Sequence, residues 1–165
     1  MQIFVSCPPG VADLTAAELR NCGATQTREF KLGVQAEGSL EVAYRACLWS
    51  RTASRVLLPL GTFPAATQDQ LYQGVASIDW QQHVNPKGTL AIDFGGSSSG
   101  ITHTHFGALK TKDAIVDQFR DRTGERPSVQ LEQPDVRIDV RLDRDRATVS
   151  LDLSGDSLHR RAHRA

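Results

Sequence analysis

The sequence has few cysteines and no long apolar run, and these absences exclude several classes of protein. Cys7, Cys22 and Cys47 are widely spaced and form no CxxC pair, which argues against a disulfide scaffold and a zinc finger and favours a reducing compartment. The N-terminus lacks the basic segment and apolar stretch of a signal peptide. No run approaches the roughly 18–20 apolar residues that span a bilayer. We therefore expect a cytoplasmic, soluble protein with no membrane partner.

Motifs of catalytic sites are also missing. The chain has no GxSxG nucleophile motif, no GxxxxGK[ST] loop and no GxGxxG spacing. The cysteines are not accompanied by His and Asn residues in a sequence order typical of a catalytic site with an activated thiol. We predict that the chain carries no complete catalytic site of its own.

Net charge gives no indication of a polyanionic partner, because 19 Lys and Arg balance 19 Asp and Glu. Such a partner is not excluded, since binding depends on where the charges lie. Most basic residues fall after residue 100, where many alternate with Asp. The exception is the tail around Arg160 and Arg161, which has no acidic residue between 159 and 164. We predict that this tail contacts phosphates, with a disordered basic end as the alternative.

Hydrophobic periodicity predicts an α+β fold that begins with a small β-α-β-β-α-β unit. Residues 2–6 read as a strand, 11–22 as a helix, 26–37 as two short strands and 56–63 as a buried strand. Residues 40–49 form an amphipathic helix for which Ser39 is the expected cap. This order is that of the ferredoxin-like split βαβ unit.

A second unit of order α-β-α-β-β follows. We expect helices over 67–78 and 104–122, a strand over 89–94, and two alternating strands over 136–142 and 147–153. The segment 143–146 reads as the turn between the last two strands. The glycine- and serine-rich loop 95–100 is expected to be a flexible connector.

The helix predicted over 104–122 is the most informative stretch. Its apolar stripe is predicted from five residues: Ala108, Leu109, Ile115, Val116 and Phe119. Lys110 lies outside this stripe and Lys112 inside it, both in the first turns, where the helix dipole disfavours cations. An anion held at the helix start would explain them. The alternative is that Lys110 pairs with Asp113 or Asp117 while the stem of Lys112 covers the edge of the core.

Further candidates lie in loops and in two histidine pairs. Lys87, Ser97 and Ser98 are candidate polar contacts from loops on either side of the strand 89–94. A metal site built from His103 and His105 with His159 and His163 is the alternative, but no other ligand completes a familiar motif, so we expect no metal.

Three stretches together resemble a known family. They are FGALKTKDAIVD at 106–117, PDVR at 134–137 and LDLSGDSLHRR at 151–161. They are similar to the N-terminal part of bacterial 23S rRNA guanine-N2 methyltransferases, which are often labelled putative N6-adenine-specific DNA methylases. The segments 4–19 and 44–51 fit the same family. One departure is Ala162-His163-Arg164, where the family usually has Gly-Tyr-Arg.

The resemblance implies a ferredoxin-like domain at 1–64, a THUMP RNA-binding domain at 65–155 and a basic linker at 156–165 leading to a methyltransferase domain. It implies that S-adenosylmethionine binds in that downstream domain and that this chain has no cofactor. The expected partners are structured RNA, with 23S rRNA as the target, and the downstream domain. We expect the RNA contacts to come from Lys110, Lys112, Arg160, Arg161, Lys87, Ser97 and Ser98. Alternatives are a THUMP module of a tRNA-modifying enzyme, a metal-dependent enzyme and a domain that binds only protein.

Overall fold

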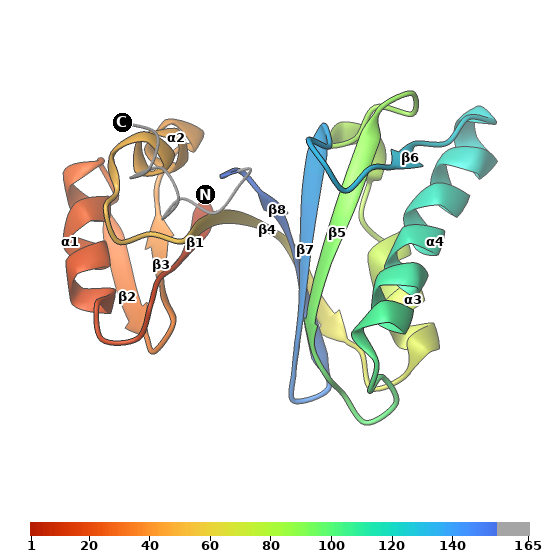
Figure 1. The fold of residues 1–165 in the computed structure, drawn as a ribbon, viewed down its shortest axis with the longest axis horizontal. Coiled ribbons are helices and arrows are strands. Elements are labelled where there is room, and N and C mark those ends of the chain that lie inside the picture. The colour runs from red at the N-terminus through yellow and green to blue at the C-terminus, as the bar shows by residue number, and fades with distance from the viewer. Residues whose placement is uncertain (155–165) are drawn as a thin grey trace. The chain divides into compact units, whose positions relative to one another are not determined.

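Figure 1 shows the computed structural model of the chain, which describes residues 1–154. The chain divides into two compact units. Unit 1 contains Met1–Pro59 and the segment that begins at Asp152, and unit 2 contains Leu60–Leu151. The boundary falls inside strand β4 (Arg55–Pro64). Among the described residues, no helix has the length and apolar character needed to cross a membrane.

Unit 1 has the ferredoxin-like order that the sequence predicts. Its elements are β1 (Gln2–Ser6), α1 (Ala12–Asn21), β2 (Gln26–Phe30), β3 (Gly33–Glu37), α2 (Leu40–Trp49) and the first half of β4. The strand order is β2-β3-β1-β4, and β1 pairs antiparallel with both β3 and β4. The hydroxyl of Ser39 accepts a hydrogen bond from the Val42 amide at 3.4 Å, so the predicted cap of α2 is confirmed.

The core of unit 1 lies between one face of this sheet and the two helices. Ile3, Val5 and Val34 are fully buried from the strands, and Leu19 of α1 and Ala43 of α2 pack in the same cluster. Buried and less buried residues alternate along β1 and, from Val34 onward, along β3, as expected when one face of a sheet is covered.

Unit 2 is also an α+β unit. Its elements are α3 (Gln68–Ala76), a short 3-10 helix (Trp80–Gln82), β5 (Thr89–Gly96), α4 (Thr104–Thr123), β6 (Ser128–Val129), β7 (Val136–Asp143) and β8 (Arg146–Asp152). The strand order is β4-β8-β7-β5-β6, and β5 runs parallel to β6 and β7. Figure 1 shows α3 and α4 side by side on one face of β5 and β7. The 3-10 helix and β6 are not predicted from the sequence.

The buried face of α4 is rotated from the predicted stripe. Ile115, Val116 and Phe119 are buried as predicted, but Leu109 is 39% exposed, so its assignment to the core is wrong. The reason is Gly107, at which an added Cβ would lie 2.2 Å from the ring of Phe94 on β5. This close approach of helix and strand centres the buried face on six residues: Gly107, Thr111, Ala114, Ile115, Val116 and Phe119.

Candidate nucleic-acid interface

The two lysines of α4 lie beyond the first turn of the helix, although its start is where the sequence predicts it. The helix begins at Thr104, so Lys110 is its seventh residue and Lys112 its ninth. The dipole effect falls off within the first turn. In addition, residues two positions apart are separated by about 200° around a helix, so the two ammonium groups point to opposite sides. The structure therefore does not bring Lys110 and Lys112 together at one anion site.

Each lysine has its own contact. The Nζ of Lys110 lies 6.0 Å from the centroid of the Tyr72 ring on α3. The Nζ of Lys112 lies 3.6 Å from Oδ1 of Asp113, which is longer than a direct hydrogen bond. Lys110 thus lies against α3, whereas Lys112 lies on the side of α4 that faces away from it.

Lys112 lines a cleft between α4 and the segment that leads into β6. This α4–β6 cleft has a volume of about 320 Å³ and is lined by nine residues: Lys112, Asp113, Val116, Asp117, Arg120, Arg126, Pro127, Ser128 and Val129. Its lining therefore includes three cationic and two acidic residues. Arg120 lies 3.6 Å from Asp117, and within residues 1–154 no acidic group forms an ion pair with Arg126. The cations of the cleft are thus only partly neutralised.

Arg126 and Ser128 were not predicted as site residues. The sequence marks them only as the end of a helix, because Gly124 and Pro127 lie on either side of Arg126. Their position depends on β6, in which Ser128 pairs with Thr89 and Val129 with Leu90 of β5. A strand of two residues has no detectable alternation, so no signal in the sequence brings Arg126 next to Lys112.

The loop 95–100 is more ordered than predicted. Gly95 and Gly96 belong to β5. Ser99 donates hydrogen bonds from its amide and its hydroxyl to the carboxylate of Asp145, both at 2.7 Å. These hydrogen bonds lower the pKa of the Asp145 carboxyl, and the one from the Ser99 amide has the larger effect. The Gly100 amide donates to the carbonyl of Ala66 at 2.7 Å, so these bonds hold the loop to other parts of unit 2.

The predicted loop contacts do not form one cluster. Ser97 and Ser98 follow the end of β5, whereas Lys87 precedes its start, roughly 25 Å away along the strand. Ser97 and Lys87 are exposed. The Oγ of Ser98 is buried, and no hydrogen-bond partner for it is found among residues 1–154. Arg160 and Arg161 lie outside the described residues.

The structure gives no support to the metal alternative in the part of the chain that it describes. Between residues 1 and 154, no group of three or more His, Cys, Asp or Glu side chains is close enough to hold a metal ion. His103 and His105 are exposed at the start of α4, and both rings contact Phe106. His159 and His163 lie outside the described residues.

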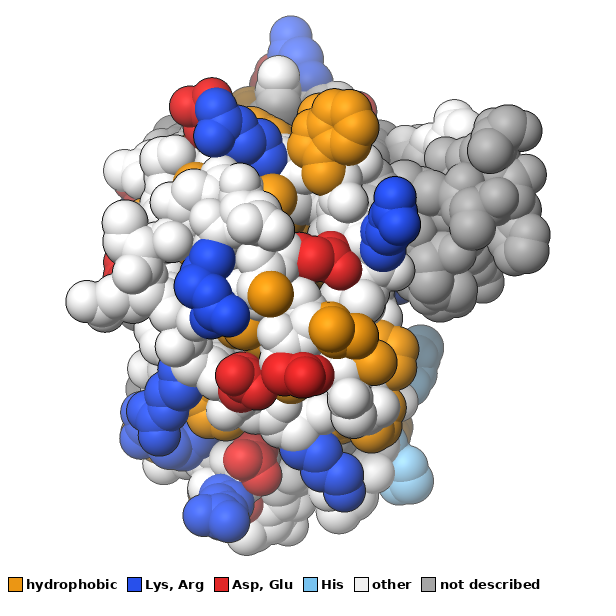
Figure 2. All heavy atoms as spheres, turned by 90° about the vertical axis from the view of Figure 1, so that its left-hand side faces the viewer, with side chains coloured by type: hydrophobic (Ala, Val, Ile, Leu, Met, Phe, Trp, Pro, Cys, Tyr) orange, Lys and Arg blue, Asp and Glu red, His pale blue; other side chains and the backbone are white. Residues whose placement is uncertain are grey.

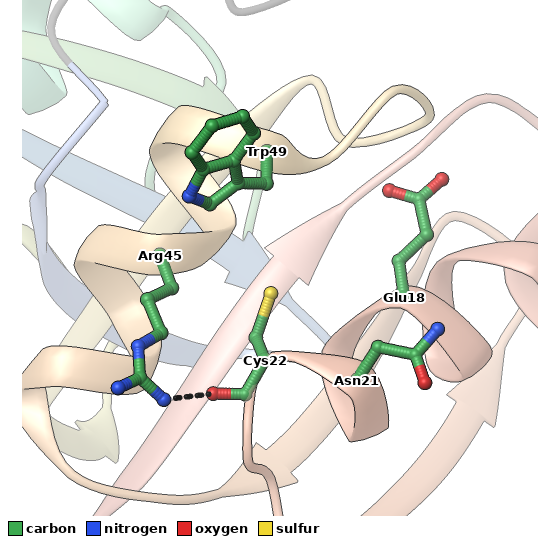
Figure 3. Close-up of a pocket in the computed structure, with 5 residues that line it drawn as sticks. All are labelled: Glu18, Asn21, Cys22, Arg45 and Trp49. Atoms are coloured by element: carbon green, nitrogen blue, oxygen red, sulfur yellow. Dashed lines mark hydrogen bonds between the residues drawn. The ribbon is translucent and has the colours of Figure 1, made fainter.

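Unit 1 has a hollow of about 400 Å³ between α1 and α2, shown in Figure 3. Arg45 donates to the carbonyl of Cys22 at 3.3 Å and to Glu41 at 2.5 Å, and Glu18 accepts bonds from the amide of Arg51 and the hydroxyl of Thr52. Burial, followed by the charge of Glu18, raises the pKa of the Cys22 thiol, which lowers its reactivity. These groups hold the two helices together and do not form a nucleophilic site.

The surface charge is mixed on the face that Figure 2 shows. Lys and Arg side chains alternate there with Asp and Glu, and neither sign covers the face alone. This face therefore offers no continuous patch of one sign to a charged partner.

Comparison with known proteins gives close relatives along the whole chain. A ribosomal RNA large subunit methyltransferase K/L from Syntrophotalea carbinolica is 52% identical over 165 residues, all of this chain and 23% of that protein. The protein of the same name from Methylococcus capsulatus is 54% identical over 161 residues, 98% of this chain and 22% of that protein. The chain thus spans about a quarter of the length of these relatives.

A solved structure has the same fold. The SMU.472 protein complexed with SAH aligns with a TM-score of 0.87 at 26% identity, over 99% of this chain and 44% of that chain. Two family descriptions match the sequence directly. The RlmL ferredoxin-like domain matches residues 2–57 and the THUMP domain matches residues 65–152, which confirms both predicted folds. Because the second match covers more than half of its residues, the chain belongs to the THUMP domain family, here joined to an RlmL-type ferredoxin-like domain.

Proposed function

We propose that this chain is an RNA-binding module that docks structured 23S rRNA for an S-adenosylmethionine-dependent guanine-N2 methyltransferase domain in a longer protein. The names of the 52% and 54% identical relatives, which act on large subunit ribosomal RNA, support this proposal. In this division of roles, residues 1–64 and 65–155 form the RNA-docking part, and residues 156–165 lead to the catalytic part.

S-adenosylmethionine belongs to that catalytic part and not to this chain. The glycine-rich loop 95–100 is the stretch here that most resembles a cofactor loop, since it joins a strand to a helix. Three of its amides, those of Ser98, Ser99 and Gly100, already donate hydrogen bonds within the protein. These donors are therefore not free to hold a cofactor, and the loop does not fit the group.

The observation that carries the proposal is the α4–β6 cleft. Lys112 and Arg126 come from two different segments, and Arg126 has no acidic partner in the described part of the chain. A phosphate of folded RNA can bind both cations, while the hydroxyl of Ser128 offers a donor beside them. Recognition through phosphates and shape is the usual way in which proteins bind structured RNA.

The test is binding of the full chain to a labelled hairpin of 23S rRNA, with a DNA duplex of matched sequence for comparison. We expect Lys112→Ala and Arg126→Ala each to weaken RNA binding by about 1 kcal/mol, or about fivefold. Arg122→Ala is the matched control, because it removes a cation from the same helix outside the cleft, where Arg122 pairs with Asp79 at 3.0 Å. Equal affinity of wild type and both cleft variants would contradict the assignment of the cleft.

The other predicted contacts are tested in the same assay. Lys110, Lys87, Ser97, Ser98, Arg160 and Arg161 remain predictions as RNA contacts. Lys110→Ala is the informative variant, since it lies on the opposite side of α4 from Lys112. A loss of binding as large as that of Lys112→Ala would place RNA on both sides of the helix. Competition between the rRNA hairpin and tRNA separates this function from that of a tRNA-modifying enzyme.

A further inference from the structure

The face of the unit 1 sheet that turns away from α1 and α2 has an unusual composition. In β1 and β3, Ile3, Val5, Val34 and Ala36 pack in the core with the helices. Because side chains alternate along a strand, Phe4 and its neighbours in register lie on the opposite face. The pairs on that face include Phe4 with Gln35 and with the buried Leu57 of β4, Gln35 with Arg28, and Gly33 with Phe30. We call the residues Phe4, Arg28, Phe30 and Gln35 the open sheet face.

Two phenylalanines meet on the open sheet face. The ring centroids of Phe4 and Phe30 lie 6.4 Å apart, with an angle of 49° between the ring planes. Gly33 makes room for this arrangement, since an added Cβ would lie 2.4 Å from Cζ of Phe4. Phe30 nevertheless remains 42% exposed, on the edge strand β2. An exposed aromatic ring beside a second ring is a surface on which a planar base can stack.

The same surface carries positive charge. The guanidinium carbon of Arg28 lies 5.2 Å from the centroid of the Phe30 ring. Lys31 follows Phe30 in the turn between β2 and β3, and both cations are exposed. No acidic group of residues 1–154 forms an ion pair with Arg28 or Lys31, whereas Glu37 at the far end of β3 lies 3.6 Å from the N-terminal ammonium. The cations near Phe30 therefore match a polyanion whose bases are accessible.

We propose that the open sheet face binds unpaired nucleotides of single-stranded RNA. A base stacks on Phe30 beside Phe4, the guanidinium of Arg28 moves from the ring to the neighbouring phosphate, and Lys31 binds the next phosphate. Unpaired bases are the part of an RNA that aromatic side chains read, whereas the α4–β6 cleft requires only phosphates. This inference rests on the proposed function, because it assumes that RNA is the ligand, but it assigns a separate site on a separate unit.

The test compares two RNA probes with the full chain. One is a short single strand that contains 2-aminopurine, whose fluorescence falls when the base stacks. The other is a hairpin whose two fully paired strands are joined by a non-nucleotide linker, so that it has no unpaired base. We expect Phe30→Ala to abolish most of the fluorescence change and to weaken binding of the single strand by about tenfold, as for the loss of one stacked base. Binding of the paired hairpin stays unchanged. Phe30→Tyr keeps an aromatic ring and restores both signals.

Phe30→Leu is the second variant, since it keeps apolar contact with Phe4 without an aromatic ring, and its circular dichroism is compared with wild type. It supports the proposal if it is folded and has lost the fluorescence change. If Phe30→Ala and Phe30→Leu both keep the fluorescence change and the affinity of wild type, the open sheet face is not a binding site. The proposed function stands in that case if the hairpin still binds. If wild type binds neither probe, the proposed function and this site both fail. If an unrelated acidic peptide competes for binding as strongly as RNA does, the proposal is also overturned, in favour of a protein partner.

Discussion

Tyr72 and Asp117 connect the two helices of unit 2. The phenol of Tyr72 on α3 donates a hydrogen bond of 2.5 Å to the carboxylate of Asp117 on α4. This bond, and burial to a smaller extent, raises the pKa of Tyr72 to about 12 from its ordinary value of 10. The folded state therefore holds the phenol proton more tightly than the unfolded state does. The resulting stabilisation is complete below pH 10 and is lost as the pH rises toward 12.

We expect Tyr72→Phe to lower the free energy of unfolding by about 1 kcal/mol at pH 7, because it removes a partly exposed hydrogen bond to a charged group. The variant keeps the ring against which Lys110 lies, so the loss reports the hydroxyl alone. Urea denaturation of wild type and variant at pH 7 and at pH 11 measures the difference, which should shrink at the higher pH. Equal stability at pH 7 would show that water replaces the bond without cost.

At the scale of an element, the turn of the β7–β8 hairpin has a backbone conformation that costs free energy. Its turn residues Arg144 and Asp145 both have positive φ values, 51° and 60°. Two such residues are typical of a type I′ turn, which prefers Asn and Gly. At Asp145 this conformational cost is offset by the hydrogen bonds from Ser99. Arg144 is exposed, and its side chain has no such bond in the described part of the chain.

We therefore expect Arg144→Asn to stabilise unit 2 by about 0.5–1 kcal/mol, because Asn adopts the left-handed conformation more easily. Thermal or urea denaturation measures the gain. Arg146→Asn is the control, since it removes the same charge from a residue that lies in β8 and is not among those with positive φ. An equal gain in both variants would mean that charge, and not backbone conformation, is the cause.

A comparison of individual helices and strands shows why most of them could be predicted from the sequence and some could not. The amphipathic pattern at 40–49 and its cap Ser39 identify α2 because the signal is local. By contrast, β6 contains two residues and exists only because it pairs with β5. The buried face of α4 is set by the approach of Gly107 to Phe94, thirteen positions earlier in the chain, which periodicity within the helix cannot reveal.

The candidate sites follow the same rule. The sequence points to Lys112 as a candidate because a cation near the start of a helix opposes the helix dipole, which is a local signal. Arg126 was missed because its relation to Lys112 depends on β6. Phe30 and Arg28 read as parts of an ordinary short strand, and only the register with β3 and β1 brings Phe30 close to Phe4. Tertiary pairing, not local propensity, assembles both surfaces.

At the scale of the whole molecule, the balance of 19 basic and 19 acidic residues limits long-range attraction to RNA. Affinity then depends on a small number of local phosphate contacts. Their number can be measured from how steeply the affinity falls with salt concentration. Each contact with a duplex contributes about 0.9 to the slope of log affinity against log salt concentration. A protein with a strong overall positive charge would instead show a steep slope that no pair of substitutions changes much.

We expect the double variant Lys112→Ala, Arg126→Ala to reduce the slope measured with the paired hairpin by about 1.8, the contribution of two contacts. Phe30→Ala should leave that slope unchanged, because the paired hairpin offers no unpaired base to the open sheet face. Titrations at a series of potassium chloride concentrations give both values. If the double variant binds more weakly but with the wild-type slope, Lys112 and Arg126 shape the cleft without contacting phosphate, and the RNA backbone must lie on another surface of the molecule.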